Sequence, residues 1–183
     1  MAEAFSNSIT RAVGIVTTYS GSTIGAAGTS ITVTANTGIG VSDLIDNQNF
    51  IAGTRVAQID GTTIYADRDS TNTTSATSQT IRFLGPTTSY TSPAATKSII
   101  IGGTFANNTQ NSVNLTVEVL DSSVGVTSTG AVAIASKIPI PAGSSFVISD
   151  TGKTLLEATD ELRVYCDTTN AVDVSLSILT GVN

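Results

Sequence analysis

Carboxylates are the side chains of this sequence best suited to chemistry. The 183 residues include 14 Asp and Glu, no histidine and one cysteine. Without histidine the chain lacks the commonest general base, the commonest zinc ligand and every Ser-His or Cys-His pair. Two carboxylates alone can hydrolyse a glycosidic bond, but the sequence pairs none of them, and most lie in Gly-, Ser-, Thr- and Asn-rich stretches typical of turns. We therefore predict no catalytic residue and expect that the chain is not an enzyme.

The strongest candidate for a ligand site is the polar run Asp67-Arg68-Asp69-Ser70-Thr71-Asn72. Oxygen atoms of Asp67, Asp69 and Asn72 could bind calcium. The run lacks the Gly at its sixth position and the Glu at its twelfth that an EF-hand uses. The alternative is a hydrophilic hairpin tip whose Asp and Asn side chains bond the local backbone. We adopt this second interpretation and predict no metal and no cofactor.

The remaining motifs add no chemistry. Cys166 lies in the strand-like run Leu162–Cys166, so it is expected to be a buried, small apolar residue that forms no internal disulfide. No nucleophile elbow, phosphate-binding loop or dinucleotide fingerprint is present. Aromatic residues make up 5% of the chain and tryptophan is absent. This disfavours the aromatic platforms on which carbohydrate and single-stranded nucleic acid stack.

Composition and charge exclude several partners. The net charge is −6, with 8 Lys and Arg in total, so the chain has no basic face for phosphates and we expect no direct contact with nucleic acid. No run of about 18 apolar residues is present, so no membrane span is expected. The opening residues Met1–Ser6 have no basic stretch followed by an apolar one, so no secretory signal is expected.

Short strands with Gly, Pro and Asn turns account for the pattern of the whole sequence. Ser30–Ala35 alternates, with Ile31, Val33 and Ala35 expected inward. Asp60-Gly61 predicts a hairpin between 55–59 and 62–66. Further strands are expected at 80–84, 98–106, 113–120, 132–140, 145–149, 154–158, 161–166 and 172–179. The connections are too short for helical crossovers, so the fold class is all-β, an antiparallel β-sandwich or jelly roll.

The strands of the second half are stronger than those of the first. Val113, Leu115, Val117 and Val119 share one face of their strand, while Asn114, Thr116 and Glu118 share the other. Such strands can close a core of their own. The first half alternates less and predicts a smaller β module. The polar run 87–93 is expected to cross between the two.

Three segments of the second half carry a resemblance to a known family. They are Tyr90–Gly102 with Phe105-Ala106-Asn107, then Lys137–Ser145, and Leu155–Val164. Together they resemble small virion structural proteins of tailed bacteriophages, particularly those of cyanobacteria. Such proteins often open like Ala4–Arg11 and continue almost directly into the Tyr-Thr-x-Pro segment. The resemblance implies a sandwich domain made of residues 1–13 and 89–183, with residues 14–88 inserted as a smaller β domain.

The inserted stretch has a resemblance of its own. Val41–Ile45, Ile51–Val56 and Ile59–Ile64 look like a β motif that is common in phage tail, fibre and decoration proteins. Both resemblances imply a virion component, and neither transfers any catalytic residue.

These resemblances predict a structural role in the virion, after assembly in the host cytoplasm. The leading expectation is a capsid decoration or cement protein that bridges major capsid proteins and forms a homo-oligomer. Low charge suits such broad contact, because few flexible charged side chains must be ordered. The alternatives are a neck, collar or tail component and, less favoured, a receptor- or carbohydrate-binding module.

Overall fold

The described part of the chain is β structure throughout. A computed structural model describes residues 3–124, 130–148 and 153–182. Fifteen strands run through these residues, and all the paired strands are antiparallel. Over these same ranges, no helix is long and apolar enough to cross a membrane. The predicted all-β, antiparallel fold class is confirmed.

The chain divides into two compact units. Unit 1 combines Met1–Gly14 with Thr87–Asn183, and unit 2 is Ile15–Pro86. The sequence-based boundaries fall after residues 13 and 88, one and two residues from these. Gly14 belongs to unit 1 because its carbonyl oxygen accepts a hydrogen bond from the amide of Asn170 (3.0 Å). A Cβ at Gly14 would lie 2.0 Å from the carbonyl oxygen of Thr168, so only glycine fits there.

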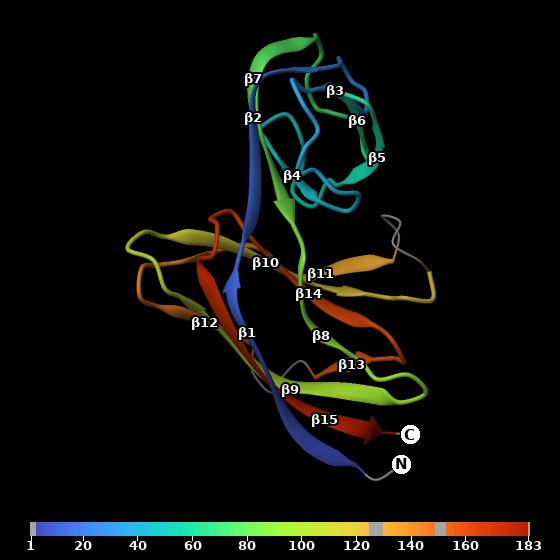
Figure 1. Ribbon diagram of the computed structural model, residues 1–183, viewed down its shortest axis with the longest axis vertical. Helices are drawn as coiled ribbons and strands as arrows, with labels where there is room; N and C mark the ends of the chain where they lie inside the picture. The colour runs from blue at the N-terminus through green and yellow to red at the C-terminus, as the bar shows by residue number, and fades with distance from the viewer. Residues whose placement is uncertain (1–2, 125–129, 149–152, 183) are drawn as a thin grey trace. The chain divides into compact units, whose positions relative to one another are not determined.

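Unit 1 is a sandwich of two sheets (Figure 1). The sheet that we call the β1 sheet has the order β1-β15-β9-β12, and β13 also pairs with β9. The second, the β8 sheet, has the order β11-β10-β14-β8. The β1 sheet contains β1 (Ala4–Val13), β9 (Lys97–Asn107), β12 (Ser145–Ile148), β13 (Thr154–Leu156) and β15 (Val172–Val182). The β8 sheet contains β8 (Thr87–Thr91), β10 (Val113–Leu120), β11 (Ala131–Ile140) and β14 (Glu161–Cys166).

Strand pairing in unit 1 follows the jelly-roll scheme. When β12 and β13 count as one position, the first strand pairs with the last, β1 with β15. The second pairs with the seventh, β8 with β14, and the third with the sixth, β9 with β12 and β13. The fourth pairs with the fifth, β10 with β11. This nesting arises when one long antiparallel ribbon wraps into two facing sheets, as in a jelly roll.

The core of unit 1 lies between the two sheets and takes alternate residues from each strand. Leu115 and Val117 of β10 are fully buried there, as their alternation predicts. Phe105 of β9 and Leu176 of β15 come from the opposite sheet. Cys166 is fully buried in the same cluster, which confirms the prediction for this residue.

Unit 2 is a six-stranded sheet rolled into a small closed barrel. Its order is β4-β7-β2-β3-β6-β5, and the two ends of this order meet. The amide of Val56 in β5 donates to the carbonyl oxygen of Asp43 beside β4 (2.9 Å), and the amide of Ser42 donates to the carbonyl oxygen of Val56 (2.8 Å). Closure leaves no free edge strand. The strands are β2 (Ile15–Ile24), β3 (Ser30–Thr32), β4 (Leu44–Asp46), β5 (Val56–Asp60), β6 (Thr63–Ala66) and β7 (Ala76–Gly85).

The barrel has its own apolar core, and two local predictions can be tested in it. The hairpin at Asp60-Gly61 is confirmed, because β5 and β6 pair across it. Ile31 and Val33 are buried in the barrel core as predicted. The inward placement predicted for Ala35 is wrong: β3 ends at Thr32, so the alternation does not continue to this residue, which is exposed.

The polar run after the barrel also differs from its prediction. Thr87–Thr91 was expected to be a crossing between modules, but it forms β8 at the edge of the β8 sheet. Its register with β14 pairs Thr91 with Glu161 and Tyr90 with Leu162. Because these residues are mostly small and polar, only the pairing with β14 defines the segment as a strand.

Candidate functional site

The predicted ligand run lies in unit 2, where two of its three candidate residues hold the backbone. Asp67 Oδ1 accepts a hydrogen bond from the amide of Arg55 (2.7 Å). The Asn72 side-chain amide donates to the carbonyl oxygens of Thr74 (2.7 Å) and Gly25 (3.2 Å). Asp69 is exposed. The run joins β6 to β7, which do not pair with each other, so the predicted hairpin tip is wrong. Asp67 and Asn72 still bond backbone groups, at Thr74 locally and at Arg55 and Gly25 far along the chain.

No cluster that could hold a metal ion is found within residues 3–124, 130–148 and 153–182. Such a cluster would need at least three His, Cys, Asp or Glu side chains, and none of that size occurs there. The carboxylates of these ranges are spread over separate strands and turns.

One carboxylate lies within a strand, not in a turn, and is fully buried. Glu118 lies on β10 with no exposed surface, and its Oε1 accepts a hydrogen bond of 2.5 Å from the hydroxyl of Tyr165 on β14. Tyr165 is equally buried. The alternation correctly placed Glu118 on the face opposite Val117, yet that face is covered at this point. The sequence predicted which face Glu118 occupies but not that this face is buried.

A second group of polar contacts lies beside this pair on the outer face of the β8 sheet. Arg163 lies directly across from Glu118 in the register of β10 and β14. Arg163 Nε donates to Glu161 Oε2 (2.8 Å), which also accepts from the Thr88 hydroxyl of β8 (3.1 Å). The polar side chains of this face therefore satisfy one another across three strands.

Other carboxylates of unit 1 hold turns together. Asp160 is buried, and its Oδ1 accepts from the amide of Ser122 (3.0 Å). Asp167 Oδ1 accepts from the amide of Asn114 (2.9 Å). Hydrogen bonds from the Ser123 hydroxyl and amide lower the pKa of the Asp121 carboxyl. These groups stabilise turns, as Asp side chains commonly do.

Unit 2 contains a buried carboxylate of a different kind. Asp43 is 5% exposed, and burial raises the pKa of its carboxyl above the ordinary value, because a charge is costly away from water. Its Oδ2 accepts a hydrogen bond of 2.8 Å from the amide of Gly40, which opposes that rise.

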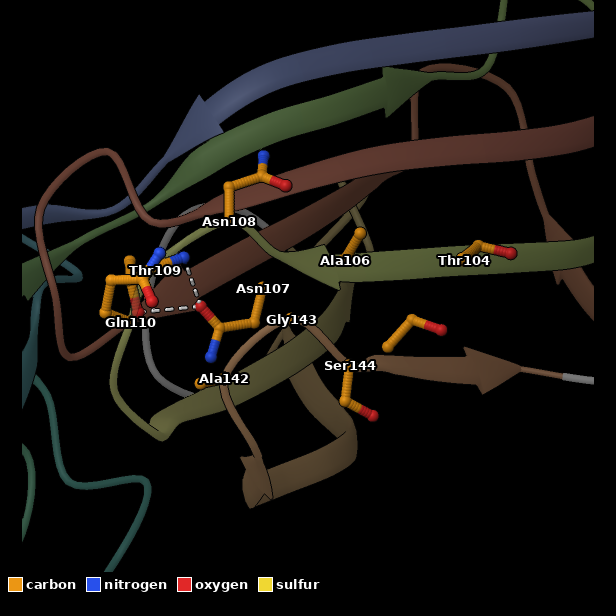
Figure 2. A pocket seen from close by; sticks show the side chains of 10 residues that line it. Thr104, Ala106, Asn107, Asn108, Thr109, Gln110, Ala142, Gly143 and Ser144 are labelled. Atoms are coloured by element: carbon orange, nitrogen blue, oxygen red, sulfur yellow. Dashed lines mark hydrogen bonds between the residues drawn. The ribbon is translucent and has the colours of Figure 1, made fainter.

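A hollow in unit 1 is polar and uncharged (Figure 2). Its volume is about 620 Å³. The end of β9 and the two turns that follow β9 and β11 form its walls. The lining contains no acidic, basic or aromatic side chain and consists of Thr104, Ala106, Asn107, Asn108, Thr109, Gln110, Ala142, Gly143, Ser144 and Ser145. It offers hydroxyl and amide groups for hydrogen bonding but no group for proton transfer.

Asn107 lines this hollow and holds its two turns together, and the sequence alone assigned it no role of this kind. The residue is 2% exposed, and its amide donates to the carbonyl oxygens of Asn111 (2.7 Å) and Ile140 (2.9 Å). Its Oδ1 accepts from both the amide and the hydroxyl of Thr109 (2.8 Å each), which Figure 2 draws as dashed lines. Asn107 therefore joins the two turns. An Asn directly after the apolar run 98–106 is the sequence signal that could have identified it, because a polar side chain buried at a strand end must find hydrogen-bond partners.

The outer face of the β1 sheet contrasts with that of the β8 sheet because it leaves large apolar side chains open to water, among polar residues such as Asn7, Ser175 and Ser177. Phe5 and Ile9 of β1 are 79% and 73% exposed. Phe5 lies opposite Leu179 of β15, Leu179 opposite Ile99 of β9, and Ile99 opposite Leu155 of β13. These residues form one apolar row across four strands. We call this row, together with Ile9 and Val147, the apolar face.

Comparisons with known proteins leave the family open. No family model matches the chain, and no curated protein matches it. Among solved structures, the chain is similar to one from the crystal structure of the T13 IBDV viral particle, with 7% sequence identity and a TM-score of 0.34. The similarity covers 98% of this chain and 69% of that one. A similarity this low carries no argument about function.

Proposed function

We propose that this chain is a non-enzymatic structural protein of a tailed-bacteriophage virion, most simply a capsid decoration or cement protein that stabilises the shell through protein–protein contacts. Its partners would be the major capsid protein or other virion proteins, together with further copies of the chain.

The observation that carries this proposal is the amount of apolar surface left open. Ten large apolar side chains of the described residues are exposed, in both units: Phe5, Ile9, Ile15, Val41, Ile51, Val124, Val132, Ile134, Val147 and Leu155. Single exposed apolar residues are common, but Phe5 and Leu155 belong to one continuous row with Leu179 and Ile99, and contiguous patches of this kind mark contact sites. The jelly roll of unit 1 is compatible with this role, since viral capsid domains use that architecture.

The positions of the carboxylates support the non-enzymatic part of the proposal. A glycosidase acid must touch the bond that it protonates, whereas Glu118 is fully buried against Tyr165. Asp160 and Asp167 accept hydrogen bonds from backbone amides of turns. The polar hollow has no titratable group in its lining.

A neck, collar or tail component is the alternative within the same class. It would use the same open apolar surface, and it differs only in the place and number of copies. A sugar-binding module is favoured by one observation, the hydroxyl- and amide-lined hollow beside Asn107. That hollow lacks the aromatic platform on which sugar rings commonly pack.

Cryo-electron microscopy and mass spectrometry of purified virions test the proposal. We expect many copies distributed on the capsid lattice. One ring at the portal vertex or along the tail would contradict the decoration role and favour a neck, collar or tail component. Absence from the virion would contradict both structural roles. New reducing ends after incubation with host polysaccharide would contradict the non-enzymatic role. Specific hits on a glycan array, lost in Asn108→Ala and Gln110→Ala, would favour the sugar-binding reading.

A further inference from the structure

We infer that the apolar face of the β1 sheet is the surface through which unit 1 binds a second copy of this chain. The inference rests on the proposed structural function and deepens it by assigning the self-association to one face and to named residues.

Strand β1 places small polar side chains on the core side of the sheet and large apolar side chains on the outer side, the reverse of most of its neighbour β15. Ser6, Ser8 and Thr10 lie opposite the core residues Ile178, Leu176 and Val174, so they share the core side of the sheet, where Ser8 and Thr10 are half-buried and Ser6 is exposed. The Ser8 and Thr10 hydroxyls donate to the carbonyl oxygen of Ser89 on β8 (2.8 and 3.5 Å). Phe5 and Ile9 consequently point outward. A half-buried strand normally places its apolar residues inward, so this arrangement fits a face that is covered in the assembled protein.

The rest of the apolar face continues from these two residues in register. The row Phe5–Leu179–Ile99–Leu155 crosses four strands. A second row contains Ile9 and Val147 at its ends, with Ser175 and Thr104 between them. Flat rows of this kind pack against another sheet about 10 Å away.

The charges around the apolar face are balanced, which favours a copy of the same chain as the occupant. At one end Lys97 Nζ lies 3.0 Å from Glu157 Oε1, and at the other Arg11 Nε lies 3.9 Å from Asp173 Oδ2. Each of these two pairs is neutral, and Glu3 before β1 and Lys153 before β13 add one charge of each sign, although the whole chain has a net charge of −6. Two acidic copies repel least where they meet through a neutral surface with oppositely charged groups at its rim. A strongly charged partner would gain no attraction from this face.

The size of the apolar face predicts the strength of the contact. Four strands about 4.8 Å apart and some seven residues at about 3.3 Å each cover roughly 450 Å² of projected area. Two copies together bury roughly twice that area, near the lower limit of specific interfaces. The expected dimer is therefore reversible and concentration-dependent in solution, and it would be reinforced by valency in a larger assembly.

The test is the self-association of the full chain by sedimentation velocity over a wide range of concentration. We expect the wild type to be a reversible dimer. Phe5→Thr with Ile9→Thr keeps strand-forming residues but removes apolar contact from both copies, so the dimer should weaken about a hundred-fold or more. The matched control is Val132→Thr with Ile134→Thr on β11 of the other sheet, at residues that are 65% and 42% exposed. This control should leave the dimer unchanged.

A charge-swap pair tests whether the face meets its own copy. Ser177 is exposed and lies between the row that begins at Phe5 and the row that begins at Ile9. Ser177→Arg and Ser177→Glu should each be monomeric and folded, and their mixture should dimerise again. A monomeric wild type, equal weakening in both Thr double variants, or a mixture that stays monomeric would overturn the inference. A wild-type monomer that nevertheless occurs in virions would leave the proposed function standing, whereas a dimer of a protein absent from virions would leave only the inference.

Discussion

The two outer faces of the jelly-roll unit differ in polarity and in exposure to water. On the β8 sheet, Glu118 and Tyr165 are polar, fully buried and hydrogen-bonded to each other. On the β1 sheet, Phe5 and Ile9 are apolar and open to water. The first face is complete within one chain, because its polar groups find partners on neighbouring strands. The apolar side chains of the second face are removed from water only when another surface covers them. This difference separates the part of unit 1 that stabilises the fold from the part available for assembly.

Removal of the buried carboxylate should have the largest effect on stability. Glu118→Ala removes this acceptor of the Tyr165 hydroxyl and leaves a cavity where the buried Glu118 side chain was. The free energy of unfolding should therefore fall by about 3 kcal/mol or more. Denaturant unfolding measures this loss. Glu157→Ala is the control, because Glu157 is largely exposed in its pair with Lys97 and should cost less than about 1 kcal/mol. Similar losses in both variants would contradict a closed polar face on the β8 sheet.

The partner of Glu118 should give a smaller effect in the same direction. Tyr165→Phe keeps the buried ring and removes only the hydroxyl that donates to Glu118. Loss of one partner of a buried hydrogen bond costs about 1–3 kcal/mol, so the loss should lie in that range. In the Glu118→Ala background the same change should cost much less, as a double-mutant cycle would measure. Full additivity would mean that the two residues act independently.

The open face should show the reverse behaviour. Phe5→Thr with Ile9→Thr should change the free energy of unfolding of the monomer by no more than about 0.5 kcal/mol, because both side chains are already exposed. The measurement is denaturant unfolding at a protein concentration below that of self-association. A loss as large as that of Tyr165→Phe would mean that these residues stabilise the isolated chain, and the contrast between the two faces would disappear.

The buried carboxylate of Asp43 in unit 2 should make the free energy of unfolding depend on pH. Its pKa is raised by burial, so the folded state binds the proton more readily than the unfolded chain does. Burial of the charged Asp43 carboxylate lowers the free energy of unfolding, and this loss is present in full above the folded pKa. It disappears as pH falls through the folded pKa toward 3.8, the ordinary value. The stability of the wild type should therefore rise relative to Asp43→Asn as pH falls through this window. A parallel pH dependence in both proteins would contradict this account of Asp43.

The run from Asp67 to Asn72 should give the smallest effect. Because the Asp67 and Asn72 side chains already bond the backbone, calcium at millimolar levels should leave the thermal midpoint where a chelator leaves it. Thermal unfolding monitored by circular dichroism measures both conditions. A calcium-dependent rise that is lost in Asp67→Asn would instead establish a cation site.

Strong alternation made several elements predictable from the sequence alone. The strands expected at 113–120 and 161–166 have those bounds in the structure, as β10 and β14. Both contain apolar residues at every second position, which the sandwich core requires. The turn chemistry of Asp60-Gly61 was equally informative, since few dipeptides so strongly favour a tight hairpin.

Other features depend on contacts between distant segments and could not be read from local pattern. The strand β8 exists because Thr87–Thr91 pairs with β14, far along the chain. The burial of Glu118 depends on what covers its face, whereas alternation indicates only which residues share that face. For β1 the alternation of Phe5 and Ile9 with Ser6 and Ser8 is visible in the sequence, but the side that faces the core is decided by its register with β15.

The most direct test of this account is a cryo-electron microscopy map of the purified virion at side-chain resolution. We predict that the chain repeats on the capsid lattice with the row Phe5–Leu179–Ile99–Leu155 covered by a second copy, while the Glu118–Tyr165 pair stays closed within each copy. Absence of the chain from the virion, or copies whose apolar face is open to solvent, would contradict it.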